Sequence, residues 1–246
     1  MKQILLITDG CSNMGVSPVL AAAHAVEDGI TVNVVGVIDY GTIGELGSLE
    51  ISEIAKAGGG ISRIVGTQKL AQTMQMMTRK TVVQTIQQAV NKELKHILAG
   101  STLEDLPPNR RSQVVEVVDE LTETTPLQVA LIIDASASMK PKLSAVEEAI
   151  RDLMLSLQAR EGFSELAVFH YPGRHSGEDA VMNVSWTSDL GSLKSLFNRI
   201  QMKGATPTGP AIMKVIDFFR YGTLEGHQAW RGNSDEEEGT LGDNVV

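Results

Sequence analysis

Residues 129–138 read Val-Ala-Leu-Ile-Ile-Asp-Ala-Ser-Ala-Ser, and this stretch is the clearest indication of the fold class. Its first half is wholly apolar and rich in β-branched residues, which predicts a strand that is buried on both faces. The apolar run stops at Asp134, and Ser136 and Ser138 follow at alternate positions. A carboxylate and two hydroxyl groups therefore stand at the carboxyl end of a buried strand.

A second apolar run ends in the same way, because residues 3–8 lead into Asp9 and Gly10. Along the rest of the chain, stretches with a strand pattern alternate with stretches with a helical pattern. We expect strands at residues 3–8, 30–38, 61–65, 129–134, 166–171 and 181–186, and helices at 18–28, 49–57, 68–98, 114–121, 141–160, 188–201 and 210–221. This alternation predicts an α/β fold with a doubly wound, mostly parallel, Rossmann-like sheet and helices on both faces.

The two strand-end aspartates would meet if their strands are neighbours. In an open parallel sheet, ligands bind outside the carboxyl ends of the strands, where the strand order reverses. Asp134, Ser136 and Ser138 offer three oxygen ligands there, and hydroxyl and carboxylate oxygens suit a hard cation such as Mg²⁺. The simpler alternative is that these three side chains cap the next helix and that Asp9-Gly10 is an ordinary turn.

The chain has 246 residues, which fits one large domain or two small ones. From residue 83 onward, the helical stretch at 68–98 carries a narrow apolar stripe, formed by Val83, Ile86, Val90, Leu94 and Ile97. Together with a proline-containing connector at 100–111, it makes an insert at residues 79–126. The stripe either packs within the chain or joins two chains, which could form a homodimer by exchanging halves across the insert.

Composition excludes several classes of function. The formal charge is −9, and five acids lie at residues 235–243, so the remainder carries −9 + 5 = −4. Such a mildly acidic body offers no basic face for nucleic acid, and the acidic end is expected to be disordered. The single cysteine excludes a disulfide framework, and Cys11 is either a redox group or a passive small side chain. The first apolar run is too short for a signal or a membrane span, so we expect a cytoplasmic protein without a membrane partner.

Three segments of the chain resemble the metal-site motifs of von Willebrand factor A (VWA) domains. The Asp-Ala-Ser-Ala-Ser segment at 134–138 resembles the first motif, and the Gly-Ala-Thr-Pro-Thr-Gly loop at 204–209 resembles the second, threonine-bearing one. The Ile-Thr-Asp-Gly segment at 7–10 resembles the third, which bears an aspartate. Further likeness lies in residues 29–37 and 54–60.

The order of these motifs is unusual for the family, in which the Thr-Asp-Gly strand comes last of the three. Here it opens the chain, as a circular permutation predicts. Residues 1–78 would then be the C-terminal half of one VWA-like domain and residues 127–222 its N-terminal half. The insert at 79–126 would join the two halves, and residues 223–246 would be a disordered acidic tail. The arrangement also resembles that of the YabS-type proteins of spore-forming bacilli.

The resemblance implies a metal-ion-dependent adhesion site (MIDAS) and no catalytic residues. Ser136, Ser138 and Thr206 would ligate Mg²⁺ or Mn²⁺ directly or through water, and Asp134 and Asp9 would hold its waters and balance its charge. One position on the metal would stay open for an Asp or Glu carboxylate of a partner protein. This arrangement is physically reasonable, since Mg²⁺ usually keeps several waters and outer carboxylates orient the inner ligands.

An alternative function is a Mg²⁺-dependent phosphate-ester hydrolase that uses Asp9 or Asp134. Apart from Lys140 and Lys203, we expect no basic residue close enough to the motifs to stabilise a phosphoryl group. Ser136 also stands where a nucleophilic Asp-x-Asp motif would offer its second aspartate. The binding module therefore remains the leading hypothesis.

Overall fold

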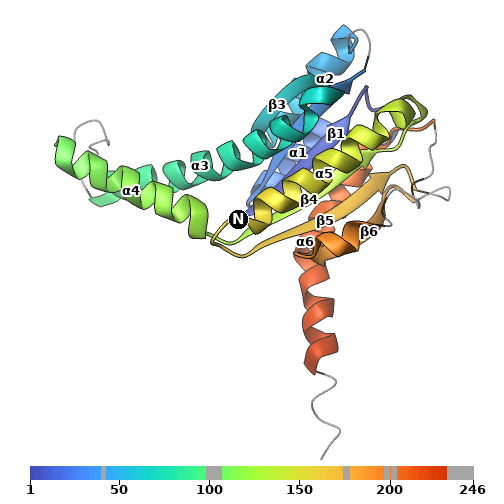
Figure 1. Ribbon diagram of the computed structural model, residues 1–246. Coiled ribbons are helices and arrows are strands. Elements are labelled where there is room, and N and C mark those ends of the chain that lie inside the picture. Colours follow the sequence, from blue (N-terminus) through green and yellow to red (C-terminus); the bar gives the residue numbers. More distant parts are fainter. Residues whose placement is uncertain are drawn as a thin grey trace, which may run out of the picture.

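A mixed six-stranded sheet forms the centre of the protein in the computed structural model. The structure describes residues 1–39, 43–97, 107–173, 178–194, 196, 200 and 204–231. For residues 97 and 223–231 it describes the backbone alone. The strand order is β3-β2-β1-β4-β5-β6 (Figure 1). The strands are β1 (Lys2–Thr8), β2 (Ile30–Ile38), β3 (Gly59–Gly66), β4 (Leu127–Asp134), β5 (Ser164–Tyr171) and β6 (Val181–Thr187). All neighbouring strands are parallel except β5 and β6.

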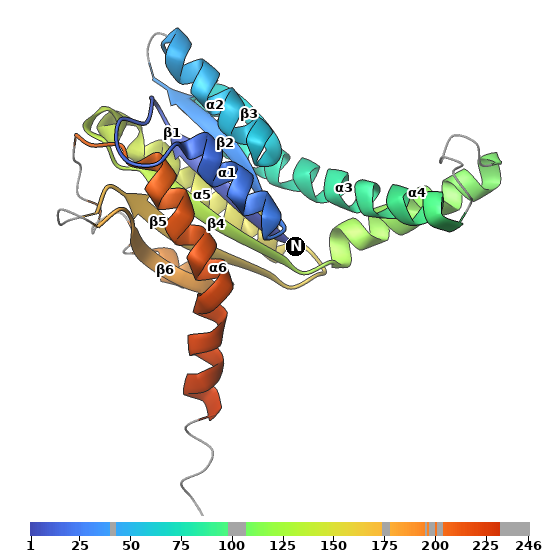
Figure 2. The same ribbon diagram turned by 180° about the vertical axis from the view of Figure 1, so that it is seen from behind.

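Helices cover both faces of this sheet, which confirms the predicted doubly wound α/β fold. One layer holds α3 (Leu70–Ile97) and α5 (Leu143–Gln158). The other layer holds α1 (Pro18–Glu27), α2 (Glu45–Ala57) and α6 (Thr208–Arg231), and it faces the viewer in Figure 2. A further helix, α4 (Pro108–Thr124), packs on α3, and short 3₁₀ helices are η1 (Thr67–Lys69), η3 (Ala137–Lys142) and η4 (Leu190–Leu193). Within the described residues, no helix has the length and apolar character needed to span a membrane.

The apolar runs are continuous because both faces of the sheet are covered. On β1, Ile4 and Leu6 face the layer of α1, α2 and α6, whereas Leu5 and Ile7 face α3 and α5. All four side chains are at most 1% exposed. Full burial of an aliphatic side chain contributes about 1.5–3 kcal/mol, so this packing holds the central strands and the positions of their ends.

The strand order reverses between β1 and β4. From β1 the chain continues to β2 and β3 on one side, and from β4 it continues to β5 and β6 on the other. The two strands are parallel, and Ile7 lies opposite Ile133. Asp9 and Asp134 therefore reach the same edge of the sheet, which is the edge where doubly wound folds bind their ligands.

The second half of α3 leaves the sheet together with α4 and forms a two-helix arm (residues 79–97 and 107–126; Figure 1). The predicted apolar stripe packs within this arm. Ile86 of α3 and Val118 of α4 are each 6% exposed, and Val90 and Val114 are partly buried beside them. Packing within the chain is thus confirmed for Ile86 and Val90 of the stripe, the side chain of Ile97 lies outside the described residues, and the homodimer stays a prediction. α3 passes the expected domain boundary at residue 79 without a break.

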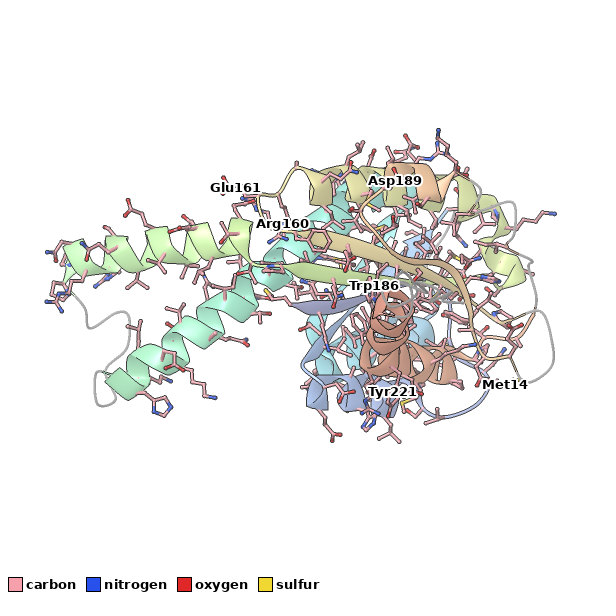
Figure 3. All side chains as sticks on the ribbon, turned by 90° about the horizontal axis from the view of Figure 1, so that it is seen from below. Met14, Arg160, Glu161, Trp186, Asp189 and Tyr221 are labelled. Carbon is pink, nitrogen blue, oxygen red and sulfur yellow. The ribbon has the colours of Figure 1, made fainter. Side chains whose placement is uncertain are left out.

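Arg160 lies where the arm meets the body (Figure 3). Its Nη2 donates to the carbonyl oxygens of Thr122 and Thr125, at 2.7 and 2.9 Å, and its Nη1 donates to Ser164 Oγ at 2.7 Å. Burial lowers the pKa of the guanidinium. These bonds tie the end of α4 to the beginning of β5.

The C-terminal part differs from the prediction at two places. α6 begins at Thr208 and continues to Arg231, so the segment that follows residue 222 is at first helical where the sequence predicts a disordered tail. The acids at 235–243 lie outside the described residues. Within the helix expected at 188–201, the structure has η4 (Leu190–Leu193), a 3₁₀ helix that Asp189 caps by accepting a hydrogen bond from Gly191 N at 2.9 Å. The predicted end of this helix at residue 201 also lies outside the described residues.

Candidate metal centre

Asp134 is the last residue of β4, and it is fully buried. Its Oδ1 accepts a hydrogen bond from Ser136 N at 2.8 Å, and its Oδ2 accepts one from Thr8 Oγ1 at 2.7 Å. Burial raises the pKa of the Asp134 carboxyl, the hydrogen bonds from Ser136 and Thr8 lower it, and the nearby Asp9 charge raises it further, so that it stays above its ordinary value. A carboxylate with these bonds is held in one orientation.

The two serine hydroxyls link Asp134 to Asp9. Ser136 Oγ and Ser138 Oγ lie 3.1 Å apart, and Ser138 Oγ donates to Asp9 Oδ1 at 2.9 Å. Ser136 occupies the N-cap position of η3 but makes no side-chain capping bond. The capping alternative therefore does not explain its hydroxyl. Asp9 likewise bonds residues of another element and not its own turn, in which Thr8 contacts Gly10.

Lys142 completes this cluster from the end of η3. Its Nζ donates to Asp9 Oδ2 at 2.5 Å and to the Ser138 carbonyl oxygen at 3.0 Å. The side chains of Lys142 and Asp9 are 11% and 6% exposed, so the ion pair is shielded from water. The remaining net charge of two carboxylates and one ammonium group is one negative charge.

Thr206 lies in the loop before α6, and this loop packs on the segment that follows Asp9. The backbone N–H of Thr206 donates to Asn13 Oδ1 at 2.8 Å, and its carbonyl oxygen accepts from Ser12 Oγ at 3.2 Å. A Cβ on Gly209 would lie 1.9 Å from the Val16 carbonyl oxygen, so glycine permits this close approach. Thr206 is thus brought to the same end of the sheet. Within the described residues, however, no hydrogen bond joins its hydroxyl to either aspartate or either serine.

The uncharacterized protein YabS of Bacillus subtilis (strain 168) is 49% identical to this chain over 216 residues, which cover 87% of each protein. The chain belongs to the YabS family. An uncharacterized protein from Alicyclobacillus acidocaldarius, known from a crystal structure, is 41% identical and matches with a TM-score of 0.83 over 92% of this chain and 96% of that one. The two proteins therefore share the fold described above. No family model matches the chain.

More distant solved structures include proximal thread matrix protein 1 from the mussel byssus, in a form with a zinc-occupied MIDAS motif. It is 15% identical to this YabS-family chain and matches with a TM-score of 0.27 over 83% of this chain and 43% of that one. A similarity this low does not establish a common fold. The resemblance of the YabS-family chain to VWA domains therefore rests on the three motifs and on the contacts that join them.

The donor set of the cluster suits a hard cation. Ser136, Ser138, Asp9 and Asp134 offer oxygen atoms alone, whereas zinc and copper sites draw on nitrogen and sulfur. The described part of the chain contains no group of three or more His, Cys, Asp or Glu that could hold a metal ion. A cation in the YabS-family chain would therefore need the serine hydroxyls as well as the carboxylates.

A pocket of about 280 Å³ opens beside this cluster. Asp9 and Lys142 form its charged side, and Asp39 adds a further carboxylate. The other lining residues are Val37, Ile38, Ile43 and Pro141. The charged cluster can thus be approached from a recess that is large enough for a side chain of another molecule.

Sequence reasoning missed three residues of the cluster in this YabS-family chain. Thr8 bonds Asp134 from the neighbouring strand, and its place directly before Asp9 at a strand end was a usable signal. Lys142 was overlooked although it follows Ser138 by four residues, about one helical turn. Tyr171 is fully buried at the end of β5, where its hydroxyl lies 3.3 Å from Thr208 Oγ1. Burial and then the nearby Asp134 charge raise the pKa of this phenol.

Cys11 is exposed and lies outside this hydrogen-bonded cluster. Burial and the nearby Glu50 carboxylate raise the pKa of its thiol. A raised pKa reduces the thiolate fraction at neutral pH, and the thiolate is the reactive form. These surroundings favour the passive role over the redox role for this residue of the YabS-family chain.

Proposed function

We propose that this YabS-family protein binds a partner protein through a Mg²⁺ or Mn²⁺ ion held at the shared end of β1 and β4. One observation carries the proposal: two serine hydroxyls lie side by side between two carboxylates. Ser138 donates its proton to Asp9, so the hydroxyl proton of Ser136 is directed to Ser138 Oγ, 3.1 Å away, while the backbone N–H of Ser136 bonds Asp134. Hydroxyl groups whose protons are engaged in this way keep oxygen lone pairs for a cation.

Each residue has a definite role in the proposed complex. Ser136, Ser138 and Thr206 ligate the ion directly or through water, and Asp134 and Asp9 hold its waters. The hydrogen bonds that Asp134 accepts from Ser136 N and from Thr8 Oγ1 suit a group that orients inner ligands from the outer shell. Neutral hydroxyl ligands leave the ion most of its charge, so it attracts an incoming carboxylate.

The partner in this proposal offers an exposed Asp or Glu to the open position on the ion. The pocket beside Asp9 and Lys142 gives room for a side chain next to that carboxylate. Neither nucleic acid nor a membrane is part of the proposal, and the protein is a binding module without an enzymatic reaction. We place it in the cytoplasm, where its one cysteine stays reduced.

The proposal includes a VWA-like domain in circularly permuted order. In a circularly permuted VWA-like domain, the strand that leads into Thr-Asp-Gly must adjoin the strand that leads into Asp-x-Ser-x-Ser. These strands are β1 and β4 here, and they pair with each other. The contact between Thr8 and Asp134 joins the two motifs directly. These contacts support the assignment of residues 1–78 and 127–222 to the two halves of one domain.

Affinity capture from the native cell tests the proposal. The full chain is immobilised and exposed to lysate in Mg²⁺ or in EDTA, beside Ser138→Ala and Thr206→Ala, which each remove one hydroxyl. Thr206→Ser is the matched control because it keeps the hydroxyl. A partner that is retained in Mg²⁺ by the wild type and by Thr206→Ser, and is lost in EDTA and in both alanine variants, supports the proposal. Capture that is unchanged in EDTA contradicts it.

Lys142 is the observation that favours the phosphate-ester hydrolase as a second candidate, since it places a cation beside Asp9, one of the two aspartates at the strand ends. Both carboxylates are engaged, however: Asp9 with Lys142 and Ser138, and Asp134 with Thr8 and Ser136. A nucleophilic role would require one of them to leave its partners. Mg²⁺-dependent turnover of a generic phosphatase substrate that is lost in Asp9→Asn would establish this alternative, and no turnover would remove it.

A homodimer through residues 79–126 is a separate proposal about assembly. α4 exposes Val117 and Leu121, at 48% and 39%. The helix is basic at its beginning, at Arg110 and Arg111, and acidic along the rest (Glu116, Asp119, Glu120 and Glu123). Two copies that pack antiparallel would bring opposite charges together. Light scattering that gives a dimer mass for the wild type and a monomer mass for Val117→Glu supports this contact, and a monomer mass for both contradicts it.

A further inference from the structure

Lys142 is an unusual residue for its position. Lysine side chains are almost never buried unless they are paired, and this one is 11% exposed and lies at the end of a short 3₁₀ helix. Its ammonium group contacts the Asp9 carboxylate and the Ser138 carbonyl oxygen. Lys140, two residues earlier in the same segment, is exposed. The chain thus places one of two neighbouring lysines inside the candidate metal centre.

The contacts divide the two oxygens of Asp9 between different partners. Oδ2 accepts from Lys142, and Oδ1 accepts from the Ser138 hydroxyl. With each oxygen bonded to a different donor, Asp9 is held in one orientation beside the hydroxyls. Lys142 therefore positions Asp9.

We propose that Lys142 is an internal counter-cation that makes metal binding depend on the arrival of a carboxylate. This inference rests on the proposed function and concerns the regulation of the same site. The Asp39 carboxylate that lines the adjoining pocket is exposed to water, whereas the shielded groups of the centre, two carboxylates and one ammonium group, carry one net negative charge. A divalent ion alone would therefore leave these shielded groups with one net positive charge. A carboxylate from the partner restores neutrality, and charges shielded from water act on each other more strongly than charges in bulk solvent.

The charge balance predicts a reciprocal coupling. The ion binds weakly without a carboxylate and more tightly with one, and by linkage the carboxylate binds only where the ion is present. Removal of the ammonium charge lets the divalent ion neutralise Asp9 and Asp134 by itself. The ion then binds tightly without a partner, and the benefit of an added carboxylate falls.

Titration of Mn²⁺ into the purified full chain measures this coupling. Binding is followed by calorimetry in chloride and in acetate at equal ionic strength, for the wild type, Lys142→Gln and Lys140→Gln. The glutamine at 142 keeps a donor for Asp9 and removes the charge, and Lys140→Gln makes the same change of charge at an exposed position. We expect acetate to tighten Mn²⁺ binding several-fold in the wild type and in Lys140→Gln. In Lys142→Gln we expect at least tenfold tighter binding in chloride and less than a twofold effect of acetate.

A merely structural role for Lys142 would give a different result, because loss of a buried ion pair would lower stability without tightening the binding of Mn²⁺. Unchanged or weaker Mn²⁺ binding in Lys142→Gln overturns the inference while the proposed function stands. If neither the wild type nor Lys142→Gln binds Mn²⁺ in either salt, the proposed function fails as well. Should Lys142→Gln not fold, the wild type and Lys142→Arg decide the matter: both must bind Mn²⁺ more tightly in acetate, and no effect of acetate overturns the inference.

Discussion

Thr8→Val tests the bond that joins β1 to β4 at the candidate metal centre. Thr8 is 2% exposed, and its Oγ1 donates to Asp134 Oδ2 at 2.7 Å. Valine has nearly the same shape and the same branching at Cβ, so the strand conformation is retained. The substitution therefore removes one hydroxyl group and little else.

The expected cost follows from the charge of the acceptor and from its burial. A hydrogen bond to a charged group contributes about 1.5–3 kcal/mol, and Asp134 keeps its bond from Ser136 N. We expect the free energy of unfolding to fall by about 2 kcal/mol near neutral pH. For a chain of this size, such a loss corresponds to a melting temperature lower by roughly 4–8 °C.

The loss should also depend on pH, in a direction that the structure fixes. Burial raises the pKa of Asp134 above 3.8, and the bond from Thr8 lowers it because that bond favours the ionised form. Thr8→Val therefore raises this pKa further. The difference between wild type and variant is largest where Asp134 is ionised in both, and it shrinks as the pH falls through the raised pKa values and Asp134 takes up a proton.

Urea unfolding, followed by circular dichroism at neutral and acid pH, measures both effects. Thr8→Ser is the control because it loses a methyl group, worth about 0.8 kcal/mol, and keeps the hydroxyl and the pH dependence. A Thr8→Val variant within about 0.5 kcal/mol of the wild type at neutral pH, the range of an ordinary surface substitution, would show that this bond does not stabilise the fold. A loss of equal size at every pH would show that the bond does not depend on the charge of Asp134.

Three further predictions concern other parts of the chain. Gly209→Ala should move the loop that carries Thr206, because a Cβ there would lie 1.9 Å from the Val16 carbonyl oxygen. Metal titration should then show weaker binding of Mn²⁺ by the variant. An unchanged affinity for Mn²⁺ would contradict the placement of this loop. Ile86→Ala, at a 6% exposed position in the arm, should cost about 2–5 kcal/mol and make the arm sensitive to limited proteolysis; a cleavage pattern like that of the wild type would argue against the packing of α3 on α4. Cys11 should react with iodoacetamide more slowly than free cysteine at neutral pH, since the pKa of its thiol is raised, and faster alkylation than that of free cysteine would show that its surroundings differ from those described.

The sheet could be predicted from the sequence because its strands are buried on both faces. β2 has the predicted bounds, and β1 and β4 differ from the prediction by one or two residues at their beginnings. β3 is longer than predicted, since its residues are exposed or half-buried and the apolar pattern is weak there. The alternation of strands and helices does not by itself show that β1 adjoins β4. That neighbour relation came from the resemblance to VWA domains, and the register of the two strands agrees with it.

The sequence predicted the aspartates and serines of the candidate metal centre but not its lysine. Residue types at strand ends identify Asp9 and Asp134, because the edge of a parallel sheet collects whatever follows its strands. Lys142 gave no such signal, since a lysine in a short helical segment is ordinarily solvated. Its burial depends on the contact with Asp9, which follows β1 and lies far away in the sequence. A side chain that is held by tertiary contacts alone cannot be read from local pattern.

Anomalous scattering from a crystal of this protein soaked in Mn²⁺ would locate the proposed ion. We expect one strong peak at the shared end of β1 and β4, bonded to Ser136 Oγ and Ser138 Oγ, with Thr206 Oγ1 reached directly or through water. Asp9 and Asp134 should lie in the outer shell of that ion. The absence of a peak at this edge of the sheet, or a peak held by the two aspartates without the serine hydroxyls, would show that the ion is not bound as proposed.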